Sequence, residues 1–276
     1  PTYKRMYYED FREELAVPKT FRDYNRVASF FTRGCNAASP TQYGSTVAIG
    51  NVVVSPSEFM PRLFAENGRL LDSRGRITLD TPEALRALEN YRETYSYSDR
   101  TIYDFWKNAL EGFADGTAAM TVVFINYASH ILNSQMSRIA GKLGFAPVPG
   151  GKPLLGGGVI GIAQSCTCPA TACKFLEWLY ADVVAPVFPM LGGLSPCRSA
   201  YSNRDISEQY PWLSTARKSF PTAQRRSNST YYQNFSELQL ETILAAHVQQ
   251  AVLGVSSPEE ALKQAQEDCN RYFQPW

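Results

Sequence analysis

The sequence lacks a charge bias and a long apolar run, and each absence excludes a class of function. Its 276 residues hold 27 lysines and arginines against 26 aspartates and glutamates, so the formal net charge is +1. Binding to nucleic acid by bulk positive charge is therefore excluded. A membrane helix needs roughly 18 consecutive apolar residues, and even the apolar stretch 175–196 is interrupted by Glu177 and Asp182. We therefore expect no membrane-spanning helix.

Histidine is scarce, which limits the chemistry of a nucleophile. The chain has 2 histidines, His130 and His247, and both fall inside helical patterns. A serine or cysteine nucleophile would need one of them as its base, but a lone histidine within a helix is more often structural. We therefore expect no catalytic residue and no enzymatic activity. Carboxylates are plentiful, so a glycosidase with paired acids stays open by composition alone.

The 6 cysteines form no recognisable framework. A chain of this length builds its own core and does not need disulfides, so we expect the cysteines to be mostly unpaired. Cys166, Cys168 and Cys173 lie closest together, but structural zinc takes four ligands and neither histidine is near. We expect no metal and no cofactor. Cys173 and Cys269 lie in helical patterns, where a cysteine is typically a small buried hydrophobe.

One glycine motif imitates a dinucleotide site. Gly156, Gly158 and Gly161 have the spacing of the fingerprint, which needs a strand before the glycines and a helix opening on them. The preceding residues make a poor strand, and residues 159–163 are themselves β-like. Dinucleotide binding is therefore not predicted. The glycines instead indicate a close approach of the backbone to a ligand or another lobe.

The pattern of caps and apolar runs predicts a layered α/β architecture. Thr20 with Asp23, and Ser257 with Glu260, have the form of capping boxes. Expected helices span residues 21–31, 82–95, 105–113, 236–252 and 258–272, with a further helix starting near residue 169. Expected strands span residues 45–54, 119–124, 143–148 and 159–163. Residues 221–232, which include Arg225 and Arg226, are expected to form a solvated surface loop.

Several blocks, in order along the whole chain, resemble one family, the extracellular solute-binding proteins of carbohydrate ABC importers. The most specific block is 113–121, which is similar to the family's Phe-x-x-Gly-x-x-Ala-Met hallmark. Residues 5–8 resemble the family's crossover strand, and Pro18-Lys19-Thr20-Phe21 resembles its helix start. The other similar blocks are residues 64–68, 79–88, 157–162, 172–179, 192–196 and 251–262.

The resemblance implies an α/β, type II periplasmic-binding-protein fold. Residues 1–152 and 200–276 would form the C-terminal lobe. Residues 153–199 would be the return segment of an N-terminal lobe that is otherwise missing from this chain. A helix over 169–180 would then expose apolar surface, and the chain would self-associate.

The resemblance also implies the function, which is non-enzymatic binding of a carbohydrate for delivery to the membrane subunits of an ABC importer. The protein would be extracytoplasmic, either periplasmic or a cell-surface lipoprotein, and this segment would bind no nucleic acid. The alternative is a cytoplasmic sugar-sensing domain of a transcriptional regulator. By resemblance, the residues that face the ligand are Glu58, Phe59, Asn126, Tyr127, Gly157, Gly158, Phe235 and Gln239. The family often has tryptophan at the position of Asn126.

Overall fold

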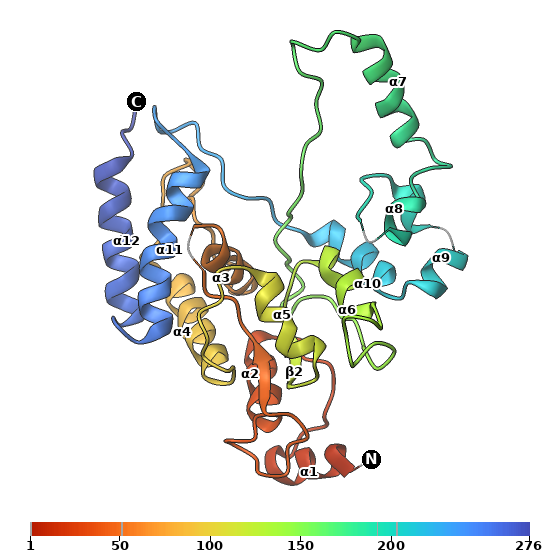
Figure 1. Ribbon diagram of the computed structural model, residues 1–276. Helices are drawn as coiled ribbons and strands as arrows, with labels where there is room; N and C mark the ends of the chain where they lie inside the picture. Colours follow the sequence, from red (N-terminus) through yellow and green to blue (C-terminus); the bar gives the residue numbers. More distant parts are fainter. Residues whose placement is uncertain (1, 51, 192, 203) are drawn as a thin grey trace.

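Four helices from distant parts of the chain enclose the largest core. The computed structural model describes residues 2–50, 52–191, 193–202 and 204–276. Helices α3 (Val54–Ala65), α4 (Pro82–Ser96), α11 (Glu237–Leu253) and α12 (Pro258–Tyr272) pack against one another (Figure 1). Phe59, Tyr91 and Leu240 are fully buried among them. The C-terminal helical hairpin therefore completes a core that residues 54–96 begin.

The helix ends follow the sequence signals. Helix α2 (Phe21–Phe30) opens with a complete capping box between Thr20 and Asp23, and α12 opens with the same arrangement at Ser257. In each box two backbone N–H groups at the start of the helix donate to side-chain oxygens. Helix α11 ends at Gly254, whose φ of 77° is a left-handed conformation that glycine adopts without strain. These predicted helices are confirmed.

A two-stranded parallel sheet lies beside the four-helix cluster. Strand β1 (Tyr43–Thr46) pairs with β2 (Ala118–Thr121), and Ser45 lies opposite Met120. Helix α5 (Trp106–Ala114) contacts both strands. The strands predicted at 143–148 and 159–163 are wrong, because these runs form no ladder with another described segment. Apolar β-branched residues make a strand only where a partner is available.

The N-terminal segment corrects another prediction. Residues 5–8, predicted to be a crossover strand, lie in helix α1 (Thr2–Phe11). Tyr7 and Phe11 are one helical turn apart, with ring centroids at 4.7 Å, and Tyr7 also packs edge-on against Phe30 at 5.1 Å. This aromatic cluster favours the helix, since residues at i and i+4 touch in a helix but lie about 13 Å apart along a strand.

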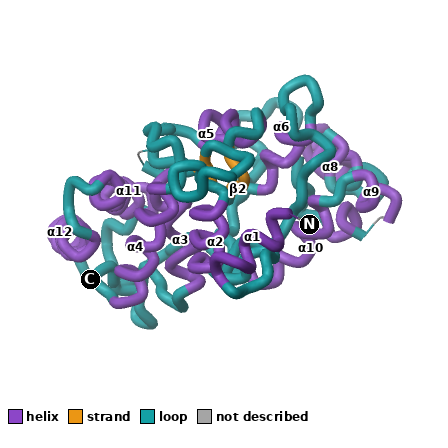
Figure 2. The backbone as a smooth tube through the Cα atoms, turned by 90° about the horizontal axis from the view of Figure 1, so that it is seen from below, coloured by secondary structure: helices purple, strands orange, loops and turns teal. Residues whose placement is uncertain are grey.

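A second, smaller core lies at the other end of the molecule. It includes α6 (Ala128–Leu132), α8 (Val187–Met190), η2 (Arg198–Tyr201), α9 (Arg204–Gln209) and α10 (Trp212–Ser219). Trp212 and Leu213 are its buried centre. Figure 2 shows α8, α9 and α10 at one end and α11 and α12 at the other, with β2 between them. The 3-10 turns η1 (Ile125–Tyr127) and η3 (Phe220–Thr222) lie at the junction.

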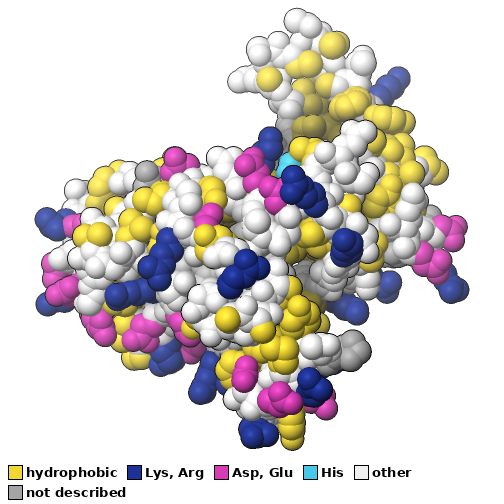
Figure 3. All heavy atoms as spheres, turned by 60° about the horizontal axis from the view of Figure 1, so that its bottom comes forward, with side chains coloured by type: hydrophobic (Ala, Val, Ile, Leu, Met, Phe, Trp, Pro, Cys, Tyr) yellow, Lys and Arg dark blue, Asp and Glu magenta, His cyan; other side chains and the backbone are white. Residues whose placement is uncertain are grey.

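Helix α7 (Pro169–Leu179) projects from the body on an extended chain (Figure 1). None of its residues is buried, and Phe175 and Trp178 are 51% and 57% exposed. The apolar exposure expected for residues 169–180 is thus observed, whereas the burial expected for Cys173 is wrong. In Figure 3, hydrophobic side chains gather on the projecting part and the adjoining side, while both signs of charge are spread over the rest. Gly192 of the resembling block 192–196 lies outside the described residues.

Within the described ranges, no helix combines the length and the apolar character needed to span a membrane.

Candidate functional site

A cavity of about 920 Å³ opens where the two cores meet. One wall is formed by α3 and the first turns of α11, and the other by α10 and η3. The segment that follows β2 forms the floor, since β2 ends at Thr121 and residues 122–127 line the cavity. Residues 153–158 close another side. They are held by hydrogen bonds from Leu155 N to Gln224 O at 2.7 Å and from Gln224 N to Pro153 O at 2.8 Å.

The structure brings together five of the eight residues that the resemblance assigns to the ligand. Those that line this cavity are Glu58, Asn126, Tyr127, Gly157 and Gly158. The other three lie elsewhere. Phe59 is fully buried in the four-helix core, because it is on the opposite face of α3 from the cavity lining. Phe235 packs against the ring of Phe273 at 5.7 Å, and Gln239 is half-buried in the first turn of α11, outside the cavity lining.

The close backbone approach expected at the glycines occurs at one of them. A side chain at Gly156 would meet the Phe124 ring at 3.0 Å, whereas Gly158 and Gly161 have open space around them. Gly157 and Gly158 also have no atom within 4 Å of an added Cβ, so their lack of a side chain leaves open space in the cavity.

Glu58 and Arg62 form an ion pair at the base of the α3 wall. Their side chains are 6% and 2% exposed, and Arg62 Nη1 lies 3.3 Å from Glu58 Oε2. Burial raises the pKa of Glu58 to about 7, although Arg62 and hydrogen bonds from Trp106 and the Ala48 backbone act in the opposite direction. A carboxyl with such a pKa exchanges its proton near neutral pH.

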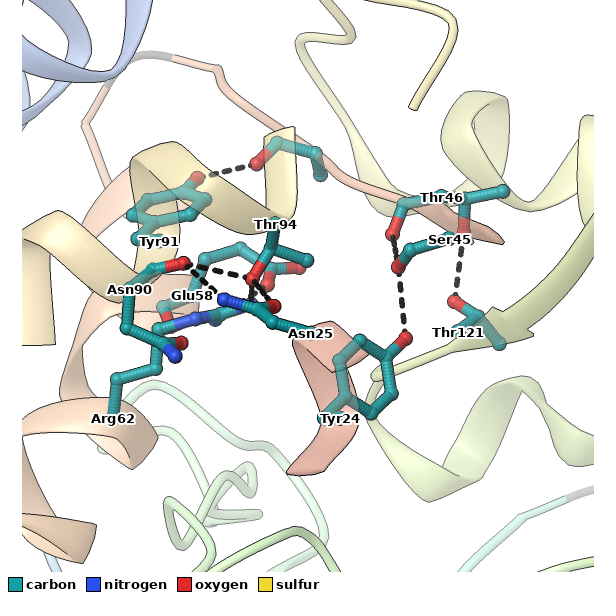
Figure 4. Close-up of polar contacts among 11 residues, drawn as sticks. Tyr24, Asn25, Ser45, Thr46, Glu58, Arg62, Asn90, Tyr91, Thr94 and Thr121 are labelled. Carbon is teal, nitrogen blue, oxygen red and sulfur yellow. Dashed lines mark hydrogen bonds and ion pairs between the residues drawn. The ribbon is translucent and has the colours of Figure 1, made fainter. Parts of the chain in front are cut away.

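Arg62 is fixed from several sides (Figure 4). Its guanidinium lies 4.7 Å from the ring centroid of Phe21 and 4.8 Å from that of Tyr91. Thr94 donates a hydrogen bond to Asn25 Oδ1 at 2.6 Å and lies 3.5 Å from Arg62 Nη2. These cation–π and polar contacts from α2 and α4 hold the arginine rigidly behind Glu58.

Arg226 and Glu241 form a second charged group on the same wall. The guanidinium of Arg226 donates one hydrogen bond to Glu241 and another to Ser57 Oγ of α3 at 2.9 Å. Its Nε lies 3.7 Å from a Glu237 oxygen. Burial raises the pKa of Glu241 to about 7, opposed by Arg226 and reinforced by Glu237. Arg226 therefore links the segment 221–232, which precedes α11, to both α3 and α11.

This group corrects the prediction of a solvated loop at residues 221–232. The polar composition of the loop hid the contacts of Arg226. A signal was present on the facing helix, where Glu237 and Glu241 are four residues apart and so lie on one face. Such a pair on one face of a partly buried helix needs a cation.

Aromatic rings supply the apolar part of the lining. Trp106 and Phe124 meet edge to face, with centroids 5.0 Å apart, and Tyr127 and Phe220 also line the cavity. Rings of this kind pack against the apolar faces of a solute, while Asn126, Ser57 and the carboxylates offer hydrogen bonds. The lining thus combines stacking surfaces with a few polar groups. Sequence reasoning missed Trp106 and Phe220, which the resemblance did not assign.

The two histidines lie away from the cavity. His130 and His247 are in α6 and α11, as predicted, and neither lines it. His247 instead lies 2.8 Å from Asp268 across the C-terminal hairpin. In the described part of the chain, no group of three histidine, cysteine, aspartate or glutamate residues is placed to hold a metal ion.

Comparisons with known proteins agree on one class. A family model described as "Bacterial extracellular solute-binding protein" matches residues 3–215. A probable amino-acid ABC transporter periplasmic-binding protein of Sinorhizobium fredii, y4oP, is 20% identical over 255 residues, which cover 91% of this chain and 56% of that protein. The chain therefore spans little more than half the length of this curated relative.

Solved structures show the same fold. Maltose-bound MalE3 of T. maritima matches with a TM-score of 0.79 at 21% identity, over 98% of this chain and 69% of that one. A solute-binding protein of Thermotoga lettingae with bound α-D-tagatose matches with a TM-score of 0.73 at 25% identity, over 98% and 68%. The fold is therefore that of the type II periplasmic binding proteins, as predicted, and the chain is a partial version of it.

Proposed function

Because the chain belongs to the bacterial extracellular solute-binding protein family, we propose that its cavity binds a saccharide without chemical turnover. The whole protein then delivers this solute to the membrane subunits of an ABC importer. It acts outside the cytoplasm, in the periplasm or as a cell-surface lipoprotein. The family match favours this function over an intracellular sugar-sensing regulator.

The observation that carries the proposal is the composition of one cavity. Five residues assigned by resemblance, from α3, η1 and the segment 153–158, line the same space as the rings of Trp106 and Phe220. Aromatic faces beside amide and carboxylate groups suit a pyranose, whose ring has apolar faces and a polar edge. We propose Glu58, Asn126, Tyr127, Gly157 and Gly158 as ligand contacts.

We propose that residues 1–152 and 200–276 form the C-terminal lobe and that 153–199 return to an N-terminal lobe. The exposure of α7 supports this division, because its apolar side chains find no partner in the described body of the molecule. Closure of two lobes around the solute would then be a hinge motion.

A thermal-shift screen of the full-length natural protein tests the function. We expect at least one mono- or oligosaccharide to raise the melting temperature by mass action, and to be recovered unchanged. Amino acids form the comparison arm, because the curated relative is described as a probable amino-acid binder. A response to amino acids with none to saccharides would overturn the proposed substrate class, and a hydrolysed saccharide would overturn binding without turnover.

Two variants test whether the saccharide binds in this cavity. Tyr127→Ala should weaken binding of the identified saccharide, since it removes a ring that lines the cavity. Tyr8→Ala is the matched control, because Tyr8 is 51% exposed on α1 and lies outside the cavity lining. Equal affinities for the two variants would contradict the assigned position of the site.

A further inference from the structure

The charges that line the cavity do not balance. Among the described lining residues, Glu58, Glu237 and Glu241 are acidic, and Arg226 is the single basic one. Arg62 compensates Glu58 from behind, which leaves Arg226 facing two carboxylates. Counted with Arg62, the wall formed by α3 and α11 holds three carboxyl groups against two guanidinium groups.

The polar groups of Arg226 are already committed. One Nη donates to Glu241 and the other to Ser57 Oγ at 2.9 Å. Its Nε is 3.7 Å from Glu237 Oε1, which is beyond hydrogen-bond distance. Arg226 therefore donates its hydrogen bonds to Glu241 and Ser57 and not to Glu237. The oxygens of Glu237 remain able to accept a hydrogen bond from a solute.

Glu237 is also accessible to a solute in the cavity. Its side chain is 35% exposed and lines the cavity from the first turn of α11, next to Leu238, which also lines it. Glu58 and Glu241 are nearly fully buried and already have partners. Of the three carboxylates, Glu237 is therefore the one that a solute reaches most easily.

The neighbouring groups favour a cation over an anion. Burial is the main cause of the raised pKa of Glu241, and the negative charge of Glu237 raises it further, so these two carboxylates share Arg226. Trp106, Tyr127 and Phe220 line the same space, and an aromatic ring attracts a cation that reaches its face. An added positive charge would be stabilised by both the carboxylates and the rings.

We propose that the solute carries a protonated amine, as an amino sugar does, and that Glu237 binds this amine while the rings pack against the sugar. The inference rests on the proposed function and narrows its substrate class. It makes Glu237 a residue that determines specificity for amino over neutral sugars.

Matched pairs of sugars test the inference. Titration calorimetry of the full-length protein at about pH 7, where such an amine is mostly protonated, compares glucosamine, galactosamine and a glucosamine trisaccharide with their N-acetylated counterparts. We expect the amine to bind at least about tenfold more tightly in one or more pairs. Neutral members that bind as tightly in every pair, or binding of neutral sugars alone, would overturn the inference while the saccharide function stands.

Two variants separate charge recognition from folding. Glu237→Gln keeps the size of the side chain and should remove the preference for the amine, with little change for the N-acetylated sugar. Glu259→Gln is the control, because Glu259 is an exposed residue in the first turn of α12 and lies outside the cavity lining. A tenfold preference that survives in Glu237→Gln would contradict the role of Glu237.

Discussion

The guanidinium of Arg226 binds the carboxylate of Glu241, and this ion pair holds the segment 221–232 against the α11 side of the cavity wall. Glu241 is 2% exposed, so its charge depends on that single partner for compensation. Burial of a carboxylate costs free energy that an ion pair only partly offsets. The raised pKa of Glu241 is the consequence, and Glu58 on α3 behaves in the same way.

These two carboxyls predict that stability falls as the pH rises from mildly acidic to neutral. In the folded protein their pKa is about 7, against 4.5 ordinarily, so the folded state binds more protons between these values. Their contribution to stability is fully present below about pH 4.5 and is lost as the pH rises through about 7. Melting temperatures measured between about pH 5 and about pH 8 should show this decline.

The variant Glu241→Gln should flatten that pH dependence, because a neutral amide takes up no proton. Glu208→Gln is the control, since Glu208 is exposed and pairs with Arg204 at the surface. A wild-type and a Glu241→Gln protein with parallel pH profiles would show that Glu241 titrates normally.

Gly44 should tolerate no side chain. A Cβ on this β1 residue would lie 1.8 Å from the carbonyl oxygen of Ala28 in α2. The clash is with helix backbone, so it can be relieved only by moving β1 away from α2. Gly44→Ala should therefore lower the free energy of unfolding by about 3 kcal/mol, measured by denaturant titration. Gly34→Ala, with no atom within 4 Å of the added carbon, should change it by less than about 0.5 kcal/mol. Similar effects at both positions would contradict the packing of β1 on α2.

The cysteines should titrate in two classes. All 6 are free thiols, and Cys269 alone is buried, with its pKa raised to about 12 by burial. A thiol reagent should therefore modify five cysteines in the native protein and Cys269 only after unfolding. Recovery of fewer than six thiols from unfolded, unreduced protein would indicate disulfides and contradict the structure.

The 276-residue chain should self-associate through α7. Phe175 and Trp178 expose adjacent rings 5.8 Å apart, and contiguous apolar surface of this kind drives association. Replacing both with glutamate should shift the mass measured by light scattering toward the monomer. Val255→Glu, at a 74% exposed residue in the turn after α11, should leave the mass unchanged. A monomeric wild-type chain would contradict the proposed return segment.

Local signals predicted the helices with a clear cap well, but missed α1 and α3 and predicted the sheet poorly. The caps at Thr20, Thr81 and Ser257 act within four residues, so the sequence alone specifies them. A strand needs a partner from elsewhere in the chain, and residues 143–148 and 159–163 found none among the described segments. Residues 5–8 were predicted as a strand from resemblance, whereas the helical spacing of Tyr7 and Phe11 favoured the helix that forms.

The cavity was partly predictable for a similar reason. Asn126 and Tyr127 follow directly from the hallmark block that ends in β2, so their place was expected from the resemblance. Arg226 depends on a contact with Ser57, 169 residues away in sequence, which no local pattern reveals. Phe59 shows the limit of the resemblance, because no helix was predicted at residues 54–65 and the face of α3 that Phe59 occupies points into the core.

A crystal structure of the full-length protein with its saccharide tests the central claim most directly. The account predicts that the sugar occupies the cavity between the α3–α11 wall and η1, within contact distance of Asn126 and Tyr127. A sugar bound elsewhere, for example in the mostly apolar cavity of about 530 Å³ beside β2 and residues 142–149, without contact to those two residues, would contradict it.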